Sequence, residues 1–551
     1  MISQLSRYYR RIEGERTVGS EAKDIAILSN LIELKSSEDP DIEVLTFVSI
    51  TDEGYQEEKR TYKDLWENGQ RIARALDEEK MNRGGAFAIV TLNHPEFVDA
   101  MVGSSIAGTV FVPIDPRTKG KKLTYMLTHS DCRGAIIGDY ALENLKEVLC
   151  DCPLLEWIWV VGSESQLSDF PLRTESISRI LATTVEPIET RVSDPDKPMQ
   201  MLFTSGTTGD PKAILSPYAR FGFVGQLGEV FGLRPNDRPY SGLSLTHANA
   251  QLITLGTTLY MGLKGVFSRK FTKSKLWDIT RHYGCTTFNL LGGMTTAIYS
   301  EAAMKTDTDN PVRFILSAGM PANIWSAFEK RFDCEIYEFY GAAEGGVLIN
   351  PPGAGPVGSI GKPPPSLVAK IVDENDVEIK NGEAGEIVFQ NVDGDCPKVL
   401  YHKNKKASEE KTAAGWLRMG DIGHRDENGW YYFHYRKGGG IRHNGDFVNP
   451  AFVEKELAEH PMIDDVFVYG VPSSNGVPGE KDVIAAIVAV DEASFDSSEI
   501  FRACKEKLES NFVPSYIQLV PEIPKTASEK PQERFLLEAF SNQKDNIFIV
   551  P

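Results

Sequence analysis

The chain has 551 residues with 78 acidic and 59 basic side chains, so its formal net charge at neutral pH is −19. At ~100–200 residues per domain, this length predicts two to four folding units. The acidic balance argues against a nucleic-acid binder whose affinity depends on neutralising phosphates. The hydrophobic content of 41% excludes wholesale disorder. The composition therefore predicts a globular, acidic protein of several domains.

The cysteines and the start of the chain indicate the cellular compartment of the protein. Seven cysteines are scattered without a CxxC pair, which predicts free thiols and offers no zinc ligand set. The opening stretch, MISQLSRYYRRIEGER, lacks the apolar core of a secretion signal. No uninterrupted apolar run of about 18 residues occurs, so we expect no membrane span. These features predict a cytoplasmic protein.

Beyond its N-terminal region, the chain alternates helical and strand-like stretches. The apolar spacing of residues 61–79 predicts a helix, and residues 86–92 (AFAIVTL) have the pattern of a buried strand. Residues 94–109 again predict a helix and residues 110–114 (VFVPI) a strand, and the same rhythm recurs over 272–350. Repeated alternation indicates parallel βαβ units, so we predict an α/β fold.

The composition and the hydrophobic pattern of the sequence change twice in its second half. Residues 351–366 are rich in glycine and proline and are followed by short strand-like runs, which predicts a small β-rich subdomain over 351–435. A polar, glycine-rich connector begins at Arg436, and the stretch after it has the pattern of an α+β unit. We therefore expect a large N-terminal domain over 1–435 and a small C-terminal domain over 436–551.

The stretch with the most distinctive chemistry is residues 201–212, MLFTSGTTGDPK. Glycines let backbone N–H groups turn toward a bound anion, hydroxyl groups add donors, and a lysine adds a mobile positive charge. It is not a Walker loop, because the required Gly-Lys-Ser/Thr ending is absent. The residues alone leave two interpretations open, a phosphate-binding loop and an ordinary surface turn. The candidate binding residues are Thr204, Ser205, Gly206, Thr207, Thr208, Gly209 and Lys212.

The segment TSGTTGDPK resembles, without gaps, the signature of the adenylate-forming enzymes, a family of acyl-CoA synthetases, peptide-synthetase adenylation domains and luciferases. Six further segments resemble motifs of this family and follow in its order along nearly the whole chain. They are SIAGTVFVPIDP (105–116), SLTHANAQ (244–251), EFYGAAEGG (338–346), GWLRMGD (415–421), YRKGGGIRHNGDFV (435–448) and PKTASEKPQER (524–534). Within the family, the chain looks most similar to crotonobetaine/carnitine-CoA ligases and to short- and medium-chain acyl-CoA synthetases.

The resemblance implies an ATP-dependent acid–thiol ligase. A carboxylate would attack the α-phosphate of ATP, releasing pyrophosphate and leaving an acyl-adenylate. The thiol of coenzyme A would then displace AMP to form a thioester. ATP, Mg²⁺ and coenzyme A would be the cofactors and co-substrates, and the C-terminal domain would rotate between the two half-reactions.

The resemblance assigns the central chemistry to three side chains. Lys530 stands where the family keeps a lysine that bridges the carboxylate and the α-phosphate by orientation and charge. Glu344 matches a Mg²⁺ ligand of the family, and a carboxylate suits this cation. His247 occupies the position of an aromatic or histidine side chain beside the acyl pocket, although a satisfied core histidine is an open alternative.

Three more residues are implied to hold the nucleotide. Tyr340 would stack on the adenine, Asp421 would accept hydrogen bonds from both ribose hydroxyls, and Arg436 would help to hold the nucleotide where the small domain begins. Because ATP, coenzyme A and a carboxylate are all anions, the site needs a local positive pocket within an acidic protein. We expect Lys212, Arg436, Lys530 and Mg²⁺ to supply it.

The sequence departs from the family pattern at several motif positions. Ala343 replaces the threonine of YGxTE, Met419 replaces the threonine of TGD, and Glu529 precedes the key lysine in place of glycine. These departures predict slower or differently regulated turnover, since each charged residue that the chemistry needs remains. The hinge motif is also unusual, because Gly438 stands where relatives often have a charged residue. We expect rotation about 437–440, with Lys437 and Gly438 as the hinge.

The residues around the predicted acyl site indicate the kind of acid. The candidate pocket mixes apolar and small side chains, which favours a small or medium carboxylic acid over a free amino acid. Its residues are His247, Gly292, Gly293, Met294, Phe339, Gly341 and Ala342.

Two further hypotheses remain open beside a ligase that uses coenzyme A. One is a stand-alone adenylation enzyme that loads a separate carrier protein. The other is a degenerate nucleotide-binding protein without turnover. The expected partners are small molecules and, by analogy with similar enzymes, a second copy in a homodimer.

Overall fold

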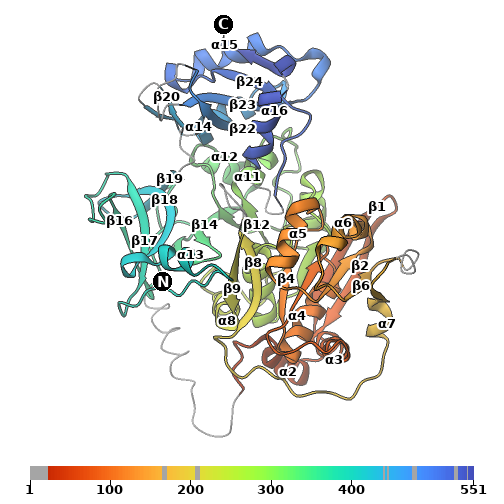
Figure 1. The fold of residues 1–551 in the computed structure, drawn as a ribbon. Coiled ribbons are helices and arrows are strands. Elements are labelled where there is room, and N and C mark those ends of the chain that lie inside the picture. Colours follow the sequence, from red (N-terminus) through yellow and green to blue (C-terminus); the bar gives the residue numbers. More distant parts are fainter. Residues whose placement is uncertain are drawn as a thin grey trace.

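We describe the protein from a computed structural model, which covers residues 23–163, 170–204, 211–437, 441–443, 446–448, 450–474, 481–526, 531–542 and 544–550. Two large sheets and their helices form the main body, and a small sheet with helices caps it at the C-terminal end (Figure 1). Among the described residues, no helix is long and apolar enough to cross a membrane. This architecture confirms the predicted α/β class with a smaller α+β unit at the C-terminus.

The larger of the two sheets has the strand order β15-β14-β13-β12-β10-β11-β1-β2. Its central pairs are parallel, and the two outermost pairs, β14–β15 and β1–β2, are antiparallel. The strands are β15 (Gly345–Asn350), β14 (Glu335–Ala342), β13 (Phe314–Ala318), β12 (Thr287–Leu291), β10 (Pro239–Ser241), β11 (Gly265–Ser268), β1 (Glu43–Thr51) and β2 (Gly54–Thr61).

The second sheet has the order β7-β6-β5-β3-β4-β8-β9 and is parallel except for the last pair. That pair, β8–β9, is an antiparallel hairpin whose connection carries the glycine- and threonine-rich loop. The strands are β7 (Arg173–Ser176), β6 (Trp157–Val161), β5 (Gly134–Gly138), β3 (Ala86–Val90), β4 (Val110–Pro113), β8 (Pro198–Thr204) and β9 (Lys212–Pro217).

Helices α3 and α4 connect the two sheets in one core. Side chains of α3 and α4 pack in the same buried cluster as side chains of β1 and β3, one strand from each sheet. The two helices approach closely where glycines face the partner helix, because a Cβ on Gly103 would lie 2.4 Å from Ile72. The helices of the main body are α2 (Leu28–Glu38), α3 (Tyr62–Glu78), α4 (Pro95–Ala107), α5 (Gly120–His129), α6 (Leu142–Val148), α7 (Ile177–Leu181), α8 (Tyr218–Gln226), α9 (Gly256–Met261), α10 (Leu276–Tyr283), α11 (Gly292–Tyr299) and α12 (Ala322–Phe332), with a π-helix, η4 (Asn249–Leu255).

The elements predicted from periodicity are confirmed. The helix expected over 61–79 is α3, which begins with a capping box between Thr61 and Asp64. The expected strand and helix that follow are β3 and α4, and the run VFVPI is β4. Buried strands of this kind have no polar face, since helices cover both sides of a parallel sheet.

Two smaller units follow the main body. The first is an antiparallel sheet of β16 (Leu367–Val372), β17 (Gly385–Asn391), β18 (Leu417–Arg425) and β19 (Tyr431–Arg436), with α13 (Lys405–Lys411) before β18. The second begins with the short pair β20 (Ile441–His443) and β21 (Asp446–Val448). It continues with β22 (Ile463–Pro472), β23 (Lys481–Ala489), β24 (Tyr516–Leu519) and β25 (Ile547–Ile549), and with α14 (Pro450–Ala458), α15 (Ser497–Lys507) and α16 (Glu533–Asn542). A domain boundary near Arg436 stays a proposal.

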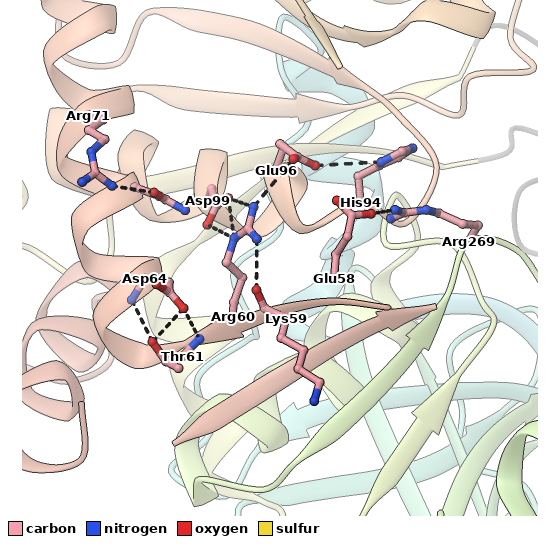
Figure 2. A network of polar contacts seen from close by, with 11 residues as sticks. Glu58, Lys59, Arg60, Thr61, Asp64, Arg71, His94, Glu96, Asp99 and Arg269 are labelled. Carbon is pink, nitrogen blue, oxygen red and sulfur yellow. Dashed lines mark hydrogen bonds and ion pairs between the residues drawn. The ribbon is translucent and has the colours of Figure 1, made fainter. Parts of the chain in front are cut away.

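A buried ion pair joins the edge strand β2 to α4 (Figure 2). Arg60 donates to Asp99 Oδ2 from Nε at 2.9 Å, its Nη2 lies 2.9 Å from the same oxygen, and Asp99 has no exposed surface. Burial raises the pKa of Asp99 to about 6, although Arg60 opposes this rise. Glu96 lies 3.6 Å from the Arg60 guanidinium. The Arg60 guanidinium therefore compensates the buried Asp99 carboxylate within the protein.

Candidate active site

The candidate site lies where the carboxyl ends of several strands meet the β16–β19 sheet. β8 ends at Thr204, and β14 ends at Ala342, two residues before Glu344. Ligands in open α/β sheets bind at this edge. A bridge between Ile214 of β9 and Tyr401 brings the segment before α13 to the same place.

Glu344 occupies the tight turn between β14 and β15. Gly345 and Gly346 follow it with φ of +128° and +67°, which explains why this turn contains two glycines. The Glu344 side chain is 6% exposed, and its Oε1 accepts a hydrogen bond from the Tyr401 hydroxyl at 2.9 Å. Arg220 donates to the main-chain oxygen of Glu344 at 2.8 Å. The carboxylate is therefore held in position by residues far away in the sequence.

Tyr340, Asp421 and Arg436 form a second group, and the structure brings all three together. The Tyr340 hydroxyl donates to Asp421 Oδ2 at 2.5 Å, and Arg436 Nε lies 3.8 Å from Oδ1 of the same carboxylate. Asp421 and Arg436 face each other in the register of β18 and β19. Burial, followed by the Asp421 charge, raises the pKa of Tyr340 well above its ordinary value. The Tyr340 ring stacks on Phe389 at 6.2 Å between centroids.

Asp421 keeps hydrogen-bonding capacity for a ligand in this arrangement. A carboxylate offers about four lone-pair sites, and Tyr340 and Arg436 engage only part of them. Ribose hydroxyls would therefore share the carboxylate with Tyr340 or take the place of its hydroxyl. The predicted roles of Tyr340 in adenine stacking and of Asp421 in ribose binding stay predictions.

Strands β8 and β9 flank the predicted phosphate loop in the sequence. Thr204 and Lys212 are register partners at the end of this strand pair, and Thr204 Oγ1 donates to the Lys212 carbonyl at 3.4 Å. The Lys212 ammonium lies 5.4 Å from the centre of the Tyr401 ring, on the side chain that also bonds Glu344. The other predicted loop residues, Ser205, Gly206, Thr207, Thr208 and Gly209, lie outside the described residues.

The sequence motifs did not reveal Lys411, which lies among these groups. It is the last residue of α13, its side chain is 14% exposed, and its Nζ lies 3.9 Å from Glu344 Oε1. Burial lowers the pKa of Lys411, and Glu344 opposes this change. Nothing in the stretch KNKKASEEK distinguishes this lysine from its neighbours. Tyr401 and Arg220 were missed for the same reason, since each reaches Glu344 from a segment without a recognised motif.

On the acyl side, His247 lies two residues before the π-helix η4. Its Nδ1 accepts the backbone N–H of Asn249 at 3.2 Å, and Asn249 Oδ1 accepts from Asn289 Nδ2 of β12 at 2.7 Å. π-Helical turns are rare and are frequent at functional sites. This chain of contacts connects His247 to the strand that ends at the predicted Gly292–Met294 segment.

The other predicted acyl-pocket residues lie at the ends of β12 and β14. Gly292 and Gly293 begin α11, and a Cβ on Gly292 would lie 2.9 Å from the Gly319 carbonyl. Met294 and Phe339 are 3% and 7% exposed and pack in separate buried clusters. Gly341 and Ala342 are exposed at the end of β14.

The hinge and the C-terminal lysine motif are described in part. The Lys437 N–H donates to the Gly420 carbonyl at 2.6 Å, and Lys437 Nζ lies 3.9 Å from Glu386. Gly438 and Lys530 lie outside the described residues. In the same C-terminal motif, the Thr526 carbonyl accepts a hydrogen bond from Arg117 of the main body at 3.2 Å.

The residues present fit one Mg²⁺ ion held together with a nucleotide. Glu344 offers a nearly buried carboxylate, and Mg²⁺ prefers oxygen ligands and is commonly held by one or two carboxylates plus substrate phosphates and water. In the part of the chain that the structure describes, no group of three or more His, Cys, Asp or Glu residues could hold a metal ion alone. A site of this kind needs the phosphates of a ligand to be complete.

Comparison with known proteins gives consistent matches. The model of the AMP-binding enzyme family matches residues 33–392, and that of the AMP-binding enzyme C-terminal domain matches residues 453–530. The medium/long-chain-fatty-acid–CoA ligase FadD17 of Mycobacterium tuberculosis is 28% identical over 505 residues, which cover 90% of this chain and 95% of that protein. The crotonobetaine/carnitine–CoA ligase of Salmonella paratyphi B is 25% identical, covering 85% and 91%.

A solved structure extends the likeness to the fold. The anthranilate CoA ligase AuaEII in complex with anthranoyl-AMP has a TM-score of 0.79 at 23% identity and covers 93% of this chain and 97% of its own. The likeness shows that the main body and the C-terminal unit share the fold of that enzyme.

Proposed function

The chain belongs to the AMP-binding enzyme family, and we propose that it joins a small or medium carboxylic acid to coenzyme A at the site around Glu344 and Asp421. It is an AMP-forming acyl-CoA synthetase, which uses ATP with Mg²⁺ and takes coenzyme A as co-substrate. The resemblance to adenylate-forming enzymes is thereby confirmed. The identity of the acid and the roles of single residues are proposals.

The observation that carries the site assignment is the convergence of motif residues from three separate segments. Glu344 comes from the β14–β15 turn, Asp421 from β18 and Lys212 from the end of the phosphate loop. Lys212, Lys411, Arg220 and Arg436 lie around these two carboxylates in a chain with a net charge of −19. Preorganised positive groups favour a reaction in which one anion must attack another.

In the first half-reaction, a carboxylate oxygen of the acid forms a bond to the α-phosphorus of ATP, and the bond to pyrophosphate breaks. Lys530 would orient the carboxylate toward the phosphorus, and Lys212 would steady the departing phosphates. Glu344, with its hydroxyl partner Tyr401, would hold Mg²⁺, which neutralises phosphate charge when bound. His247 would border the acid at the start of η4.

In the second half-reaction, the coenzyme A thiolate forms a bond to the acyl carbon, and the bond to AMP breaks. We propose that residues 436–551 rotate about Lys437–Gly440 to expose the adenylate to the thiol. Gly438→Pro should then suppress thioester formation while sparing pyrophosphate release, because proline fixes φ at the hinge. A parallel fall in both half-reactions would show that this segment is not the hinge.

We base the proposed size of the acid on the side chains at the candidate acyl pocket. Gly292 leaves no room for a side chain toward Gly319, and Met294 and Phe339 are already buried in packed clusters. The Asn249–Asn289 pair adds two buried amides beside His247. A modest acid with a polar substituent fits these walls better than a long alkyl chain.

The deciding experiment is ATP–pyrophosphate exchange with a panel of acids, followed by AMP release with coenzyme A. The panel contains carnitine, crotonobetaine, C4–C10 fatty acids and aryl acids. Exchange with a short or medium acid and AMP release that depends on coenzyme A would support the proposal. Exchange without such release would favour loading of a separate carrier protein, and no exchange with any acid would favour a degenerate nucleotide-binding protein. Lys530→Ala should abolish exchange.

Assembly and location are separate proposals. We propose a homodimer in the cytoplasm, by analogy with similar enzymes. Light scattering of the purified protein at several concentrations would test the dimer. A constant monomer mass would exclude it.

A further inference from the structure

Lys411 differs from the other lysines of its helix. Lys405 and Lys406 on α13 are 89% and 88% exposed and face Glu409 and Glu410 one turn later. Lys411 instead turns inward, with 14% of its side chain exposed. An ammonium group loses hydration when it is buried, so it needs compensating partners there.

The partners of Lys411 within the protein are loose. Its Nζ lies 3.9 Å from Glu344 Oε1 and 3.5 Å from the Met419 carbonyl. The same carbonyl accepts from Arg436 Nη2, also at 3.5 Å. Two cations therefore share one neutral oxygen, and their carboxylate partners, Glu344 and Asp421, lie 3.9 and 3.8 Å from them. An anion placed between them would complete the group.

Lys411 also contacts one of the two positions where the sequence lacks a hydroxyl and the residue that follows the other. Ala343 directly precedes Glu344, and Met419 supplies the carbonyl that Lys411 contacts. Met419 is 2% exposed, and Ala343 packs against the same buried cluster. Two motif donors are thus absent at the point where an additional cation is present.

We propose that Lys411 is a nucleotide-binding residue that contacts the α-phosphate of ATP and of the acyl-adenylate, in place of the two absent hydroxyls. This inference rests on the proposed nucleotide site. In that site, Glu344 would mark the phosphate end and Asp421 the ribose end. Lys411 Nζ lies between Glu344 and the carbonyl of Met419, and Met419 precedes Asp421 by two residues. The α-phosphate is the group that joins these two ends. An ammonium has three donors, so Lys411 keeps the Met419 contact while it binds a phosphate oxygen.

The test compares AMP with adenosine by calorimetry, without Mg²⁺ and without an acid. Lys411→Met keeps the apolar stem and removes the charge. Since hydrogen bonds to charged groups are the strong ones, we expect this variant to bind AMP about 10–100-fold more weakly and adenosine within roughly 2-fold of wild type. Lys406→Met is the matched control on the same helix and should bind both ligands as wild type does. Lys411→Arg should keep most of the AMP affinity.

Several results would overturn the inference. Equal losses for AMP and adenosine would mean that Lys411 only supports the fold, and a melting temperature of each variant checks this directly. Unchanged AMP binding together with tighter Mg²⁺ binding would mean that Lys411 merely neutralises Glu344. As a positive check, adding Ala343→Thr to Lys411→Met should restore part of the AMP affinity. If the wild type bound neither ligand, the nucleotide site itself would be refuted, which is distinct from a wild type that binds AMP with no effect of Lys411→Met.

Discussion

Two of the clusters of buried charged side chains are built differently. In the first, Arg60 reaches the fully buried Asp99 at 2.9 Å with two nitrogens (Figure 2). In the second, Lys411 lies 3.9 Å from Glu344, and Arg436 lies 3.8 Å from Asp421. In the first cluster, which we call the closed cluster, the cation contacts its carboxylate directly. In the second, the cations lie near carboxylates without direct contact.

The difference separates charge that stabilises the fold from charge that awaits a ligand. A buried pair is tolerated only when its partners compensate one another, and removing one partner is costly. Around Glu344 and Asp421, the looser contacts leave donors and positive charge available to an anion. We therefore expect substitutions in the first cluster to affect stability and those in the second to affect catalysis.

The largest expected effect is on stability, from Arg60→Met. This change leaves the Asp99 carboxylate buried without its cation, which costs about 3–5 kcal/mol in the free energy of unfolding. Denaturant unfolding at neutral pH measures the loss. Arg71→Met, which removes a more exposed pair with Glu67 on α3, is the control and should cost less than about 1 kcal/mol. Similar losses in both variants would contradict the view of a closed cluster.

Glu344→Gln should have the next largest effect, on catalysis. Losing one charged group aimed at the reacting phosphates lowers kcat by roughly 10²–10³-fold. Stability should change little, because glutamine can still accept from Tyr401. Initial rates of pyrophosphate exchange measure the effect. The exposed Glu409→Gln on α13 is the control, and an equal fall in both variants would remove Glu344 from the site.

The sequence predicted the elements better than it predicted the site. Periodicity placed α3 and β3 correctly, because a long amphipathic helix and a fully buried strand each carry a strong local signal. Family motifs identified Glu344 and Asp421, and they belong to segments whose local pattern recurs across the family. The roles of Glu344 and Asp421 could therefore be proposed from the amino-acid sequence alone, and they stay predictions.

Residues that contact the site from distant parts of the sequence could not be predicted. Tyr401 meets Glu344 across 57 positions of sequence, and Arg220 meets it across 124. Such contacts depend on how α8 and the segment before α13 pack against the β14–β15 turn, which no local pattern encodes. Lys411 was hidden in the same way, since only the packing of α13 distinguishes it from Lys405 and Lys406.

A buried carboxyl outside both clusters gives a prediction on pH. Glu338 accepts N–H donors from Gly319 and Met320, and burial raises its pKa to about 8. Between its ordinary pKa and this value, the folded protein holds one proton more than the unfolded chain. The free energy of unfolding therefore falls as pH rises through that window, by about 1.4 kcal/mol per pH unit from this group.

Glu338→Gln should remove this contribution. Glutamine does not titrate, so the variant should gain stability relative to wild type as the pH rises from about 5 to 8. Melting temperatures at several pH values measure the gain. Glu329→Gln is the control, since Glu329 is partly exposed and also accepts an N–H from β14, that of Ile336. A stability difference between Glu338→Gln and wild type that stays constant with pH would show that Glu338 is ionised in the folded protein.

The smallest expected effect contrasts two buried tyrosines. Tyr401 donates to Glu344 at 2.9 Å, and Tyr431 donates to the Ala369 carbonyl at 2.5 Å within the same small unit. Tyr401→Phe should lower the adenylation rate by about 3–10-fold with little change in melting temperature, because one modest hydrogen bond to a site carboxylate is lost. Tyr431→Phe should leave the rate unchanged and lower the melting temperature, because a buried carbonyl loses its donor. If both variants lost stability alike and neither lost activity, Tyr401 would belong with the closed cluster, and loose charge around Glu344 would not by itself identify a functional site.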